Sequence, residues 1–302
     1  MNSKKKNNIL LSIRLMTYNH SEFIIEALDG IDKQLTNFIF EVVIGDDFST
    51  DDNLEKINAF EFKNKNIKVH ILKREKGDAY WVKRQELGRL YNFTNIIENC
   101  KGKYIALLDG DDYWTDPLKL QKQVDFLEGN KDYVLCFHKV KILTTKDEIV
   151  DDFITEERYD RIKDFPISQK SLFANSNFTH TPSVMFRNII TDFPLEFKLS
   201  PVGDYFLYFM LSNHGYMHRI DEVMGVYRFG NGIYSKLSEK EKRIIGDKFQ
   251  ICLLSYTNSD YIKKRLIKNM FKKISYLEKN NIDNISIKRI FKIIIKRLKK
   301  TF

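Results

Sequence analysis

The sequence predicts an α/β protein built on a doubly wound, mostly parallel β-sheet flanked by helices. Two observations support this fold class. Up to about residue 140 of the 302-residue chain, short apolar segments alternate with segments of helical periodicity. The chain is also 43% hydrophobic and 13% aromatic, which is enough apolar material for a sizeable core. Sheets of this kind bind ligands at the carboxyl ends of their strands, so functional residues are expected there.

The predicted elements follow one another in a regular order through this part of the chain. Strands are predicted where apolar residues form short runs, and helices where apolar residues recur at helical spacing. Asp116 and Pro117 supply an N-cap and a proline at the first helical position of the helix after the fourth strand. The predicted strands are residues 9–16, 38–46, 67–72, 103–109 and 133–138, and the predicted helices are residues 21–33, 50–61, 88–100 and 116–128.

Beyond about residue 140 the pattern is less regular. Ser238 and Glu241 form a capping-box pattern at the start of a helical C-terminal region. We therefore expect a sheet-containing domain over residues 1–235 and a helical extension over residues 236–302. Before this boundary, the sequence predicts a strand at residues 178–187, a helix at residues 204–213 and a short strand pair at residues 216–219 and 223–228.

Two clusters of acidic residues follow predicted strands directly, at the edge of the sheet where ligands bind. Closely spaced carboxylates repel one another unless a cation or hydrogen-bond donors compensate. Mg²⁺ and Mn²⁺ bind oxygen ligands, often one or two carboxylates together with substrate phosphates. The second cluster therefore predicts a site for a metal ion and a phosphate. The first cluster contains Asp46, Asp47, Ser49, Asp51 and Asp52, and the second contains Asp109, Asp111 and Asp112.

Simpler interpretations stay open for both clusters. The first can supply N-caps for the helix that follows, since aspartate and threonine accept hydrogen bonds from first-turn amides. The second can be a solvated acidic turn, in which Gly110 allows the backbone to turn sharply. Its flanking residues, Leu107–Leu108 and Tyr113–Trp114, are unusual for such a turn. An EF-hand is excluded because Trp114 and Leu120 occupy the positions where it needs glycine and glutamate.

The chain is basic, with a formal net charge of +9 and a sequence pI of about 9.1, which favours polyanionic partners. The three cysteines show neither zinc-site spacing nor a disulfide pattern, which fits a reducing cytoplasm. The N-terminus has no signal-peptide core, and no apolar run approaches the ~18 residues of a spanning helix. We therefore expect a cytoplasmic protein.

Residues 284–302 interleave large apolar residues with lysines and arginines and contain no acidic residue. A basic amphipathic helix is typical of attachment to an anionic membrane surface, where each charge contributes on the order of 1 kcal/mol. The alternative is a helix packed on the domain with a solvated basic face. Nucleic acid is not an expected partner, because no pattern of stacking aromatic residues accompanies the lysines. We expect peripheral association with the inner face of the cell membrane.

Four segments together resemble the family 2 glycosyltransferases, whose catalytic domain has the GT-A fold. The likeness covers roughly residues 9–230 and is densest in residues 9–130. The most specific segment runs through Asp109–Trp114 and continues to Asp116–Pro117. The four segments are Leu15–Asn19, Val43–Asp51, Gly102–Trp114 and Gly203–Asp204.

The resemblance implies an inverting transferase that moves a hexosyl or N-acetylhexosaminyl group. The donor would be a nucleotide-diphosphate sugar, expected to be a UDP-sugar, and the acceptor a hydroxyl of a glycan or a lipid-linked molecule. The resemblance also implies a divalent cation, Mn²⁺ or Mg²⁺, and bacterial surface-polysaccharide assembly as the pathway. The implied roles are donor binding by Thr17, Asn19, Asp47, Arg84 (or Arg89 in its place), Asp109 and Asp111, metal binding by Asp111 and Asp112, and base catalysis by Asp204.

Two departures from the family pattern affect this site. Gly203 stands where the family often has glutamate before the base. The family also often places a histidine soon after a Tyr–Arg pair, where it can reach the metal ion or the diphosphate. Here Tyr227–Arg228 is followed by Phe-Gly-Asn-Gly, which leaves that side of the metal ion without a ligand. His214 or His218 could substitute, although a lone histidine is more often structural.

The chemistry of glycosyl transfer requires these residue types. Negative charge grows on the leaving diphosphate, where a cation stabilises it. One carboxylate that takes the acceptor proton suffices for a single displacement, whereas glycoside hydrolases need two carboxyl groups. Two other functions stay open. A sugar-1-phosphate nucleotidyltransferase would need a glycine- and basic-rich loop in place of Thr17–His20, and a non-catalytic nucleotide-sugar-binding or membrane-associated scaffold would not need Asp204.

Overall fold

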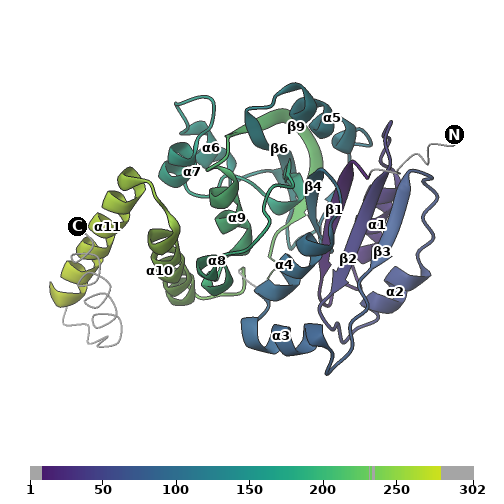
Figure 1. Ribbon diagram of the computed structural model, residues 1–302, viewed down its shortest axis with the longest axis horizontal. Coiled ribbons are helices and arrows are strands. Elements are labelled where there is room, and N and C mark those ends of the chain that lie inside the picture. The colour runs from purple at the N-terminus through teal and green to yellow at the C-terminus, as the bar shows by residue number, and fades with distance from the viewer. Residues whose placement is uncertain (1–8, 231, 233–234, 280–302) are drawn as a thin grey trace, which may run out of the picture. The chain divides into compact units, whose positions relative to one another are not determined.

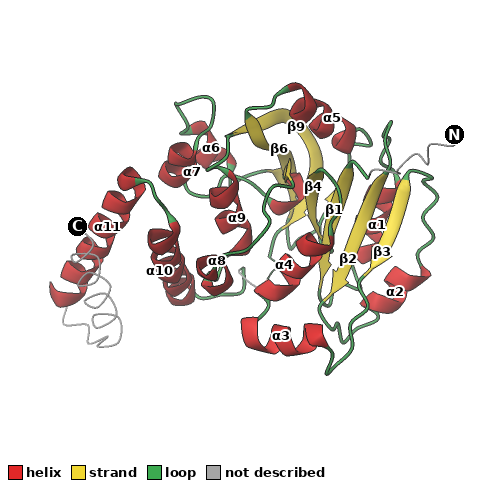
Figure 2. Cartoon of the chain, in the orientation of Figure 1, coloured by secondary structure: helices red, strands yellow, loops and turns green. Residues whose placement is uncertain are grey.

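The computed structural model describes residues 9–230, 232 and 235–279, and its contacts divide the chain into two compact units, Met1–Ile245 and Gly246–Phe302. Within the described residues, the first unit contains a nine-stranded sheet with helices packed along it (Figures 1 and 2). The predicted α/β fold class is confirmed. The predicted tail, residues 284–302, lies outside the described residues.

The first four predicted strands are confirmed and are parallel neighbours in the order β3-β2-β1-β4. Every residue of β2 is buried, and β1 and β4 are nearly so, which is why they read as continuous apolar runs. Their carboxyl ends share one edge of the sheet. The strands are β1 (Leu11–Thr17), β2 (Phe40–Asp46), β3 (Ile67–Ile71) and β4 (Tyr104–Asp109).

The helices between these strands pack apolar faces onto the sheet. In α1, Ile24, Ala27, Leu28 and Ile31 are fully buried at helical spacing. Helix α3 was not among the predicted helices, because its apolar residues lack this periodicity; the Asp78 side chain caps it by accepting from the Trp81 backbone. The helices are α1 (Ile24–Asp32), α2 (Asn53–Ala59), α3 (Ala79–Leu87), α4 (Leu90–Asn99) and α5 (Lys119–Gly129).

The helix predicted from Asp116 begins at Lys119 instead. The Asp116 carboxylate accepts a hydrogen bond from the Leu118 backbone at 2.7 Å, so it closes the turn that precedes the helix. The Pro117 carbonyl accepts from Leu35 at 2.7 Å, which ties this turn to the end of α1. The predicted N-cap was therefore wrong by two residues, since Leu118 takes that position in place of Asp116, although the Asp116 carboxylate and the Pro117 carbonyl both act directly before the helix.

The second half of the sheet is mixed. β8 runs antiparallel to both β4 and β6, and β9 runs parallel to β6. Short strands flank this part: β5 is antiparallel to β9, and β7 is antiparallel to β6. The order of the main path is therefore β3-β2-β1-β4-β8-β6-β9-β5. The strands are β5 (Tyr113–Trp114), β6 (Tyr133–Leu143), β7 (Ile149–Asp151), β8 (Met185–Arg187) and β9 (Tyr216–Arg228).

Two predictions for this half were wrong in detail. The strand predicted at residues 178–187 is confined to β8, because Pro182 lies in a 3₁₀ turn, η1 (Thr181–Ser183), directly before it. The predicted strand pair at residues 216–228 is one strand, β9. Both of its parts pair with β6, and a register shift between Ile220 and Val223 interrupts the alternating pattern that separates them in sequence.

The remaining helices include the predicted α9, whose residues 206–211 are all buried. The Ser238–Glu241 capping box is confirmed, since each side chain bonds the backbone amide of the other residue. None of the helices in the described part of the chain is long and apolar enough to cross a membrane. These elements are α6 (Glu156–Asp160), α7 (Gln169–Asn175), α8 (Leu195–Leu199), α9 (Gly203–Leu211), α10 (Glu239–Tyr256) and α11 (Asp260–Lys279).

Candidate functional site

The sheet register brings the two acidic clusters to one edge. Thr17 pairs with Asp46, and Met16 pairs with Asp109. Beside them, the Arg14 side chain is fully buried, and its Nη1 lies 2.6 Å from Asp109 Oδ1. Nε and Nη2 of this arginine are buried without a hydrogen-bond partner in the described structure. Arg14, which the sequence analysis did not single out, therefore places positive charge next to the acidic edge.

The acidic turn after β4 is held by Arg228 of β9. The Arg228 backbone donates to Asp112 Oδ1 at 2.8 Å, and its Nε donates to the Asp111 carbonyl at 2.9 Å. Its Nη2 reaches Glu26 of α1 at 2.6 Å. Asp112 is 2% exposed, whereas the Asp111 side chain is 14% exposed. Of the two predicted metal ligands, Asp111 is therefore the more accessible.

The electrostatics of this turn favour a bound cation. Burial raises the pKa of Asp111, and burial together with the charge of Asp111 raises the pKa of Asp112 well above its usual value. Within the described residues, no three His, Cys, Asp or Glu side chains converge on one metal position. Mg²⁺ and Mn²⁺ often take only one or two protein ligands beside phosphates and water, so these residues fit such an ion.

A histidine lies beside this turn, although not one that the sequence analysis considered. His20 Nε2 is 3.8 Å from Asp111 Oδ2. Gly110 makes room for it, because a Cβ at that position would lie 2.7 Å from Thr17 Oγ1 and 3.0 Å from His20 Nδ1. The only sequence signal for His20 is its place directly after the Leu15–Asn19 segment.

The two histidines considered from sequence have other surroundings. His214 is exposed just beyond the end of α9. The His218 ring stacks on Phe126 of α5 with a centroid distance of 4.2 Å, and burial lowers its pKa. His218 therefore has the structural role that is usual for a lone histidine.

Asp47 is bound by two residues of α3. The Tyr80 hydroxyl donates to Asp47 Oδ1 at 2.7 Å, and Arg84 Nε and Nη2 each lie 2.8 Å from Oδ2. Arg84 rather than Arg89 thus reaches the sheet edge; Arg89 is exposed at the start of α4. The structure joins two predicted donor-binding residues in one ion pair, and it adds Tyr80, which lies in the helix that the sequence analysis missed.

Thr17 and Asn19 anchor the loop that follows β1. Asn19 adopts a positive φ of 53°, donates its backbone N–H to Ser49 Oγ at 2.8 Å and accepts from the Thr50 backbone at 2.8 Å. Thr17 is 1% exposed and donates to Asn53 at 3.3 Å. These two residues therefore fix the loop against the first acidic cluster.

The helix-cap interpretation applies to part of the first cluster. Asp46 accepts hydrogen bonds from the Ser49 backbone at 2.8 Å and from the Asn53 side chain at 2.7 Å. Asp51 accepts from the Asn53 backbone at 3.2 Å and from the Ser21 backbone at 3.0 Å. Both carboxylates thus organise the start of α2, and Asp47 is the member that faces α3.

Asp204 lies in the first turn of α9 and is partly buried. Burial is the main cause that raises its pKa; the hydrogen bond from the Tyr205 backbone at 2.7 Å opposes this shift. The charge of Asp109 raises the pKa of Asp204 further, and that of Arg14 lowers it. The predicted base therefore lies within electrostatic range of the acidic edge.

Gly203 packs closely against Leu90 of α4 at the start of α9. A Cβ at this position would lie 2.4 Å from Leu90 Cδ1. A side chain at this position, such as the glutamate that the family often has before the base, would require the end of the Leu90 side chain to shift.

Tyr227 is a further site residue that the sequence analysis did not assign. It is partly exposed, and burial followed by the charges of Asp112, Asp111 and Asp109 raises its pKa. Its ring lies 4.5 Å from that of His180. In the sequence, Tyr227 only marks the position after which the family often has a histidine.

The comparison with protein families agrees with this geometry. The model of glycosyl transferase family 2 matches residues 12–192, which span β1 to the segment after β8. The chain belongs to this family.

The relatives extend over most of the chain. An uncharacterized protein of Mycobacterium tuberculosis is 33% identical over 218 residues, which are 72% of this chain and 58% of that protein. An uncharacterized glycosyltransferase of Methanocaldococcus jannaschii is 28% identical over 227 residues, 74% of this chain and 71% of that protein. The match therefore spans little more than half the length of the mycobacterial relative.

Solved structures confirm the GT-A-like fold. S. aureus TarS 1–349 in complex with UDP has a TM-score of 0.58 and 18% identity, and the match covers 85% of this chain and 69% of that one. The mannosyltransferase PcManGT of Pyrobaculum calidifontis, in complex with GDP-Man and Mn²⁺, has a TM-score of 0.55 and 14% identity, with 85% and 67% covered.

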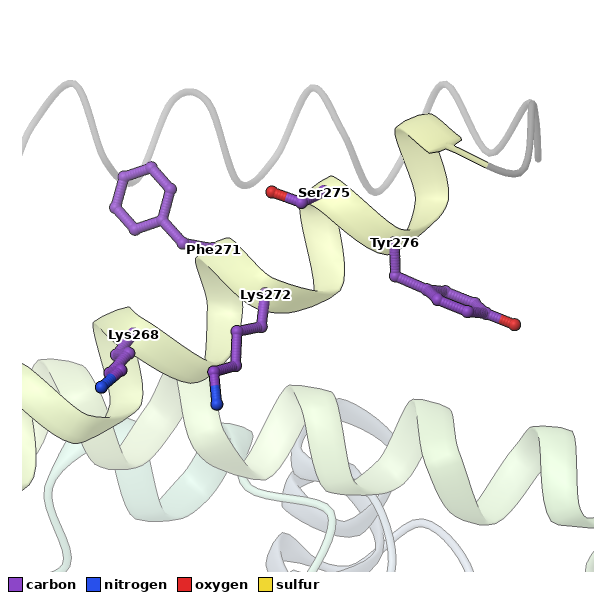
Figure 3. Close-up of a pocket in the computed structure, with 5 residues that line it drawn as sticks. All are labelled: Lys268, Phe271, Lys272, Ser275 and Tyr276. Atoms are coloured by element: carbon purple, nitrogen blue, oxygen red, sulfur yellow. The ribbon is translucent and has the colours of Figure 1, made fainter.

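A separate pocket lies on α11, in the second unit (Figure 3). Phe271 and Tyr276 are 44% and 60% exposed there, and Lys272 points to the opposite side of the helix from Phe271. The pocket has no carboxylate in its lining, which consists of Lys268, Phe271, Lys272, Ser275 and Tyr276. It therefore does not compete with the acidic edge as a site for a metal-bound diphosphate.

Proposed function

We propose that this chain is an inverting glycosyltransferase that moves a sugar from a nucleotide-diphosphate donor to an acceptor hydroxyl. The observation that carries this proposal is the meeting of two kinds of group at one sheet edge. Asp109 ends β4, Asp111 lies in the turn that follows, and the charge of Asp109 acts on Asp204 in the first turn of α9. Donor-binding carboxylates beside a partly buried carboxylate base are what a single displacement needs.

The donor site is proposed to lie over the carboxyl ends of β1, β2 and β4. Asp47, held by Arg84, would bind the base, Asp109 the ribose, and Thr17 and Asn19 would shape the loop against the nucleotide. A UDP-sugar is the proposed donor, since TarS structures contain UDP and UDP-GlcNAc. GDP-sugars belong in the same screen, because PcManGT contains GDP-Man.

Asp111 is the proposed ligand of a divalent cation, Mn²⁺ or Mg²⁺, and Asp112 is the second candidate. Such an ion would neutralise the charge that develops on the leaving diphosphate. The chain's contribution is to hold Asp111 in place through the bond from Arg228 Nε to its carbonyl. The Asp112 Oδ1 atom already accepts from the Arg228 backbone, which favours Asp111.

Asp204 is the proposed base. A raised pKa makes a carboxylate a stronger proton acceptor, so burial of Asp204 suits the removal of a proton from an acceptor hydroxyl. One carboxylate in this position is consistent with direct displacement, which inverts the anomeric centre. Asn at this position would keep the shape and lose the proton acceptor.

The acceptor is proposed to be a hydroxyl of a glycan or a lipid-linked molecule in bacterial surface-polysaccharide assembly. A putative teichuronic acid biosynthesis glycosyltransferase of Bacillus subtilis is 30% identical over 118 residues, which are 39% of this chain. Cytoplasmic location with peripheral attachment through residues 284–302 would bring the site to such an acceptor. The transferred group is proposed to be either a hexosyl or an N-acetylhexosaminyl group.

A thermal-shift panel of nucleotide sugars with and without Mn²⁺ tests which donor binds, since a ligand that binds only the folded state raises the melting temperature of the protein. Release of the nucleoside diphosphate from the stabilising donor, accelerated by an acceptor that receives the sugar, then separates an enzyme from a non-catalytic scaffold. Asp204→Asn should keep the thermal shift and abolish turnover. Normal turnover by this variant would overturn the assigned base, and the absence of any donor shift would overturn the function.

A further inference from the structure

His20 and Asp111 face each other across the acidic turn. His20 Nε2 lies 3.8 Å from Asp111 Oδ2, and the two side chains are 23% and 14% exposed. This contact is too long for a hydrogen bond. Two atoms that each lie about 2.1 Å from one metal ion are about 3.0 to 4.2 Å apart, depending on the angle between them. The separation of these two atoms falls in that range.

The backbone holds His20 in this position from both sides. Asn19 before it donates its N–H to Ser49 Oγ at 2.8 Å, and Ser21 after it donates its N–H to Asp51 at 3.0 Å. A ligand whose neighbours are fixed in this way loses little conformational freedom on binding. His20 is therefore preorganised by the first acidic cluster to face the second.

The inner face of the His20 ring is shaped by a glycine. Nδ1 is buried without a hydrogen-bond partner in the described structure, so Nε2 is the nitrogen directed to the carboxylate. A side chain at position 110 would crowd this ring, since its Cβ would lie 3.0 Å from Nδ1. Besides allowing the sharp turn, Gly110 thus leaves room for the imidazole to approach Asp111.

We propose that His20 Nε2 and Asp111 Oδ2 are the two protein ligands of the divalent cation that accompanies the donor diphosphate. This inference rests on the proposed function. It supplies the ligand that the sequence lacks after Tyr227–Arg228, from the loop that follows β1. Diphosphate oxygens and water would complete the coordination, as is common for Mg²⁺ and Mn²⁺. Because Ca²⁺ takes oxygen ligands, whereas first-row transition-metal ions also accept imidazole, Mn²⁺ would then bind more tightly than Ca²⁺.

Binding of MnCl₂, followed by the loss of the free Mn²⁺ signal in electron paramagnetic resonance, tests this without any assay of transfer. Titrations would use the full chain with UDP, and with GDP in a parallel series. His20→Ala should weaken Mn²⁺ binding by about tenfold or more. His214→Ala, which removes an exposed histidine of the same unit, should not change it. Melting temperatures of all variants verify that they fold.

Two replacements at the same position separate metal ligation from a direct contact with phosphate. His20→Glu offers a carboxylate ligand that reaches the position of Nε2 and should recover much of the Mn²⁺ affinity. His20→Lys offers only a cation and should not. Recovery with lysine but not with glutamate would overturn the proposal in favour of a phosphate contact.

The remaining outcomes distinguish this inference from the proposed function. Unchanged Mn²⁺ binding in His20→Ala together with its loss in Asp111→Asn would refute His20 as a ligand and leave the metal-assisted transferase intact. Unchanged binding in both variants would refute the metal site at the acidic turn. Absence of Mn²⁺ binding to the wild-type chain with either nucleotide would contradict both.

Discussion

Arg14 Nη1 lies 2.6 Å from Asp109 Oδ1, although the two residues are 95 positions apart in the chain. Arg14 is fully buried, and its guanidinium also packs 4.8 Å from the centre of the Phe93 ring. A buried arginine at the centre of a parallel sheet has a functional rather than a stabilising explanation, since an apolar residue would pack there at lower cost. It compensates the negative charge that the site concentrates at one edge.

Replacing Arg14 with methionine should destabilise the protein by about 3 kcal/mol, because Asp109 would lose its partner in a largely buried setting. Urea denaturation measures this change. Lys103→Met is the matched control: it breaks an exposed pair with Glu128 and should cost no more than about 1 kcal/mol. If the two variants lost equal stability, the Arg14–Asp109 pair would have no special importance.

Asp204→Asn should stabilise the folded protein at neutral pH. Burial raises the pKa of Asp204 in the folded state, so folding favours its protonated form. That contribution is fully present below the unfolded value of about 3.9 and is lost as pH rises through the folded value. The melting temperature of the variant should therefore exceed that of the wild type at pH 7, and the difference should vanish below about pH 4. A difference independent of pH would contradict this explanation.

Gly203→Ala should destabilise the protein by about 1 kcal/mol, because the added methyl group forces the end of the Leu90 side chain out of its position. Leu90→Ala in the same chain should recover part of the loss. Gly246→Ala provides the control, since no atom lies within 4 Å of a Cβ there. Thermal melts of the single and double variants measure the coupling, and strict additivity would rule the collision out.

Asp47→Asn should weaken donor-nucleotide binding about tenfold, because the neutral amide loses the ion pair with Arg84 and the charge-assisted hydrogen bonds of the carboxylate. Calorimetric titration with UDP measures the affinity. Asp52→Asn removes an acidic side chain that is 53% exposed in the same cluster and should bind UDP like the wild type. Equal losses in both variants would indicate a general charge effect.

Deleting residues 284–302 should abolish flotation of the protein with liposomes that contain anionic lipid. The basis is the sequence of this tail, in which basic and large apolar residues alternate without an acidic residue. Liposomes of neutral lipid are the control, and neither protein should float with them. Equal flotation of the full-length and shortened proteins with anionic liposomes would eliminate the tail as an anchor.

The parallel half of the fold was predictable because β1, β2 and β4 are buried on both faces and therefore have a simple apolar signal. The mixed half was not. The register shift around residues 220–223 makes β9 look like two strands, and a 3₁₀ turn shortens the strand before Arg187. Local patterns do not reveal which distant strand a segment pairs with.

The candidate site was predictable where function demands clustered carboxylates, as at Asp111 and Asp47. Its supporting residues were not, because each is defined by a partner far away in the chain. In the sequence, Arg14 is a charged residue within an apolar strand, and only the structure reveals its ion pair with Asp109. In the sequence, His20 is an ordinary loop residue, and only the structure places its ring opposite Asp111. Tyr80 belongs to a helix without apolar periodicity.

Because Arg228 lies late in the chain, it determines when the site can form during synthesis. Its backbone and side chain bind Asp112, the Asp111 carbonyl and Glu26, so the acidic turn acquires its final contacts only when the chain has been made past β9. Residues 12–192, which define the family, leave the ribosome before that point. A nascent chain would thus carry a nearly complete parallel sheet whose clustered carboxylates repel one another without the contacts from Arg228. Premature termination before residue 228 would yield a protein that contains the residues matched by the family model but lacks the contacts that hold the acidic turn.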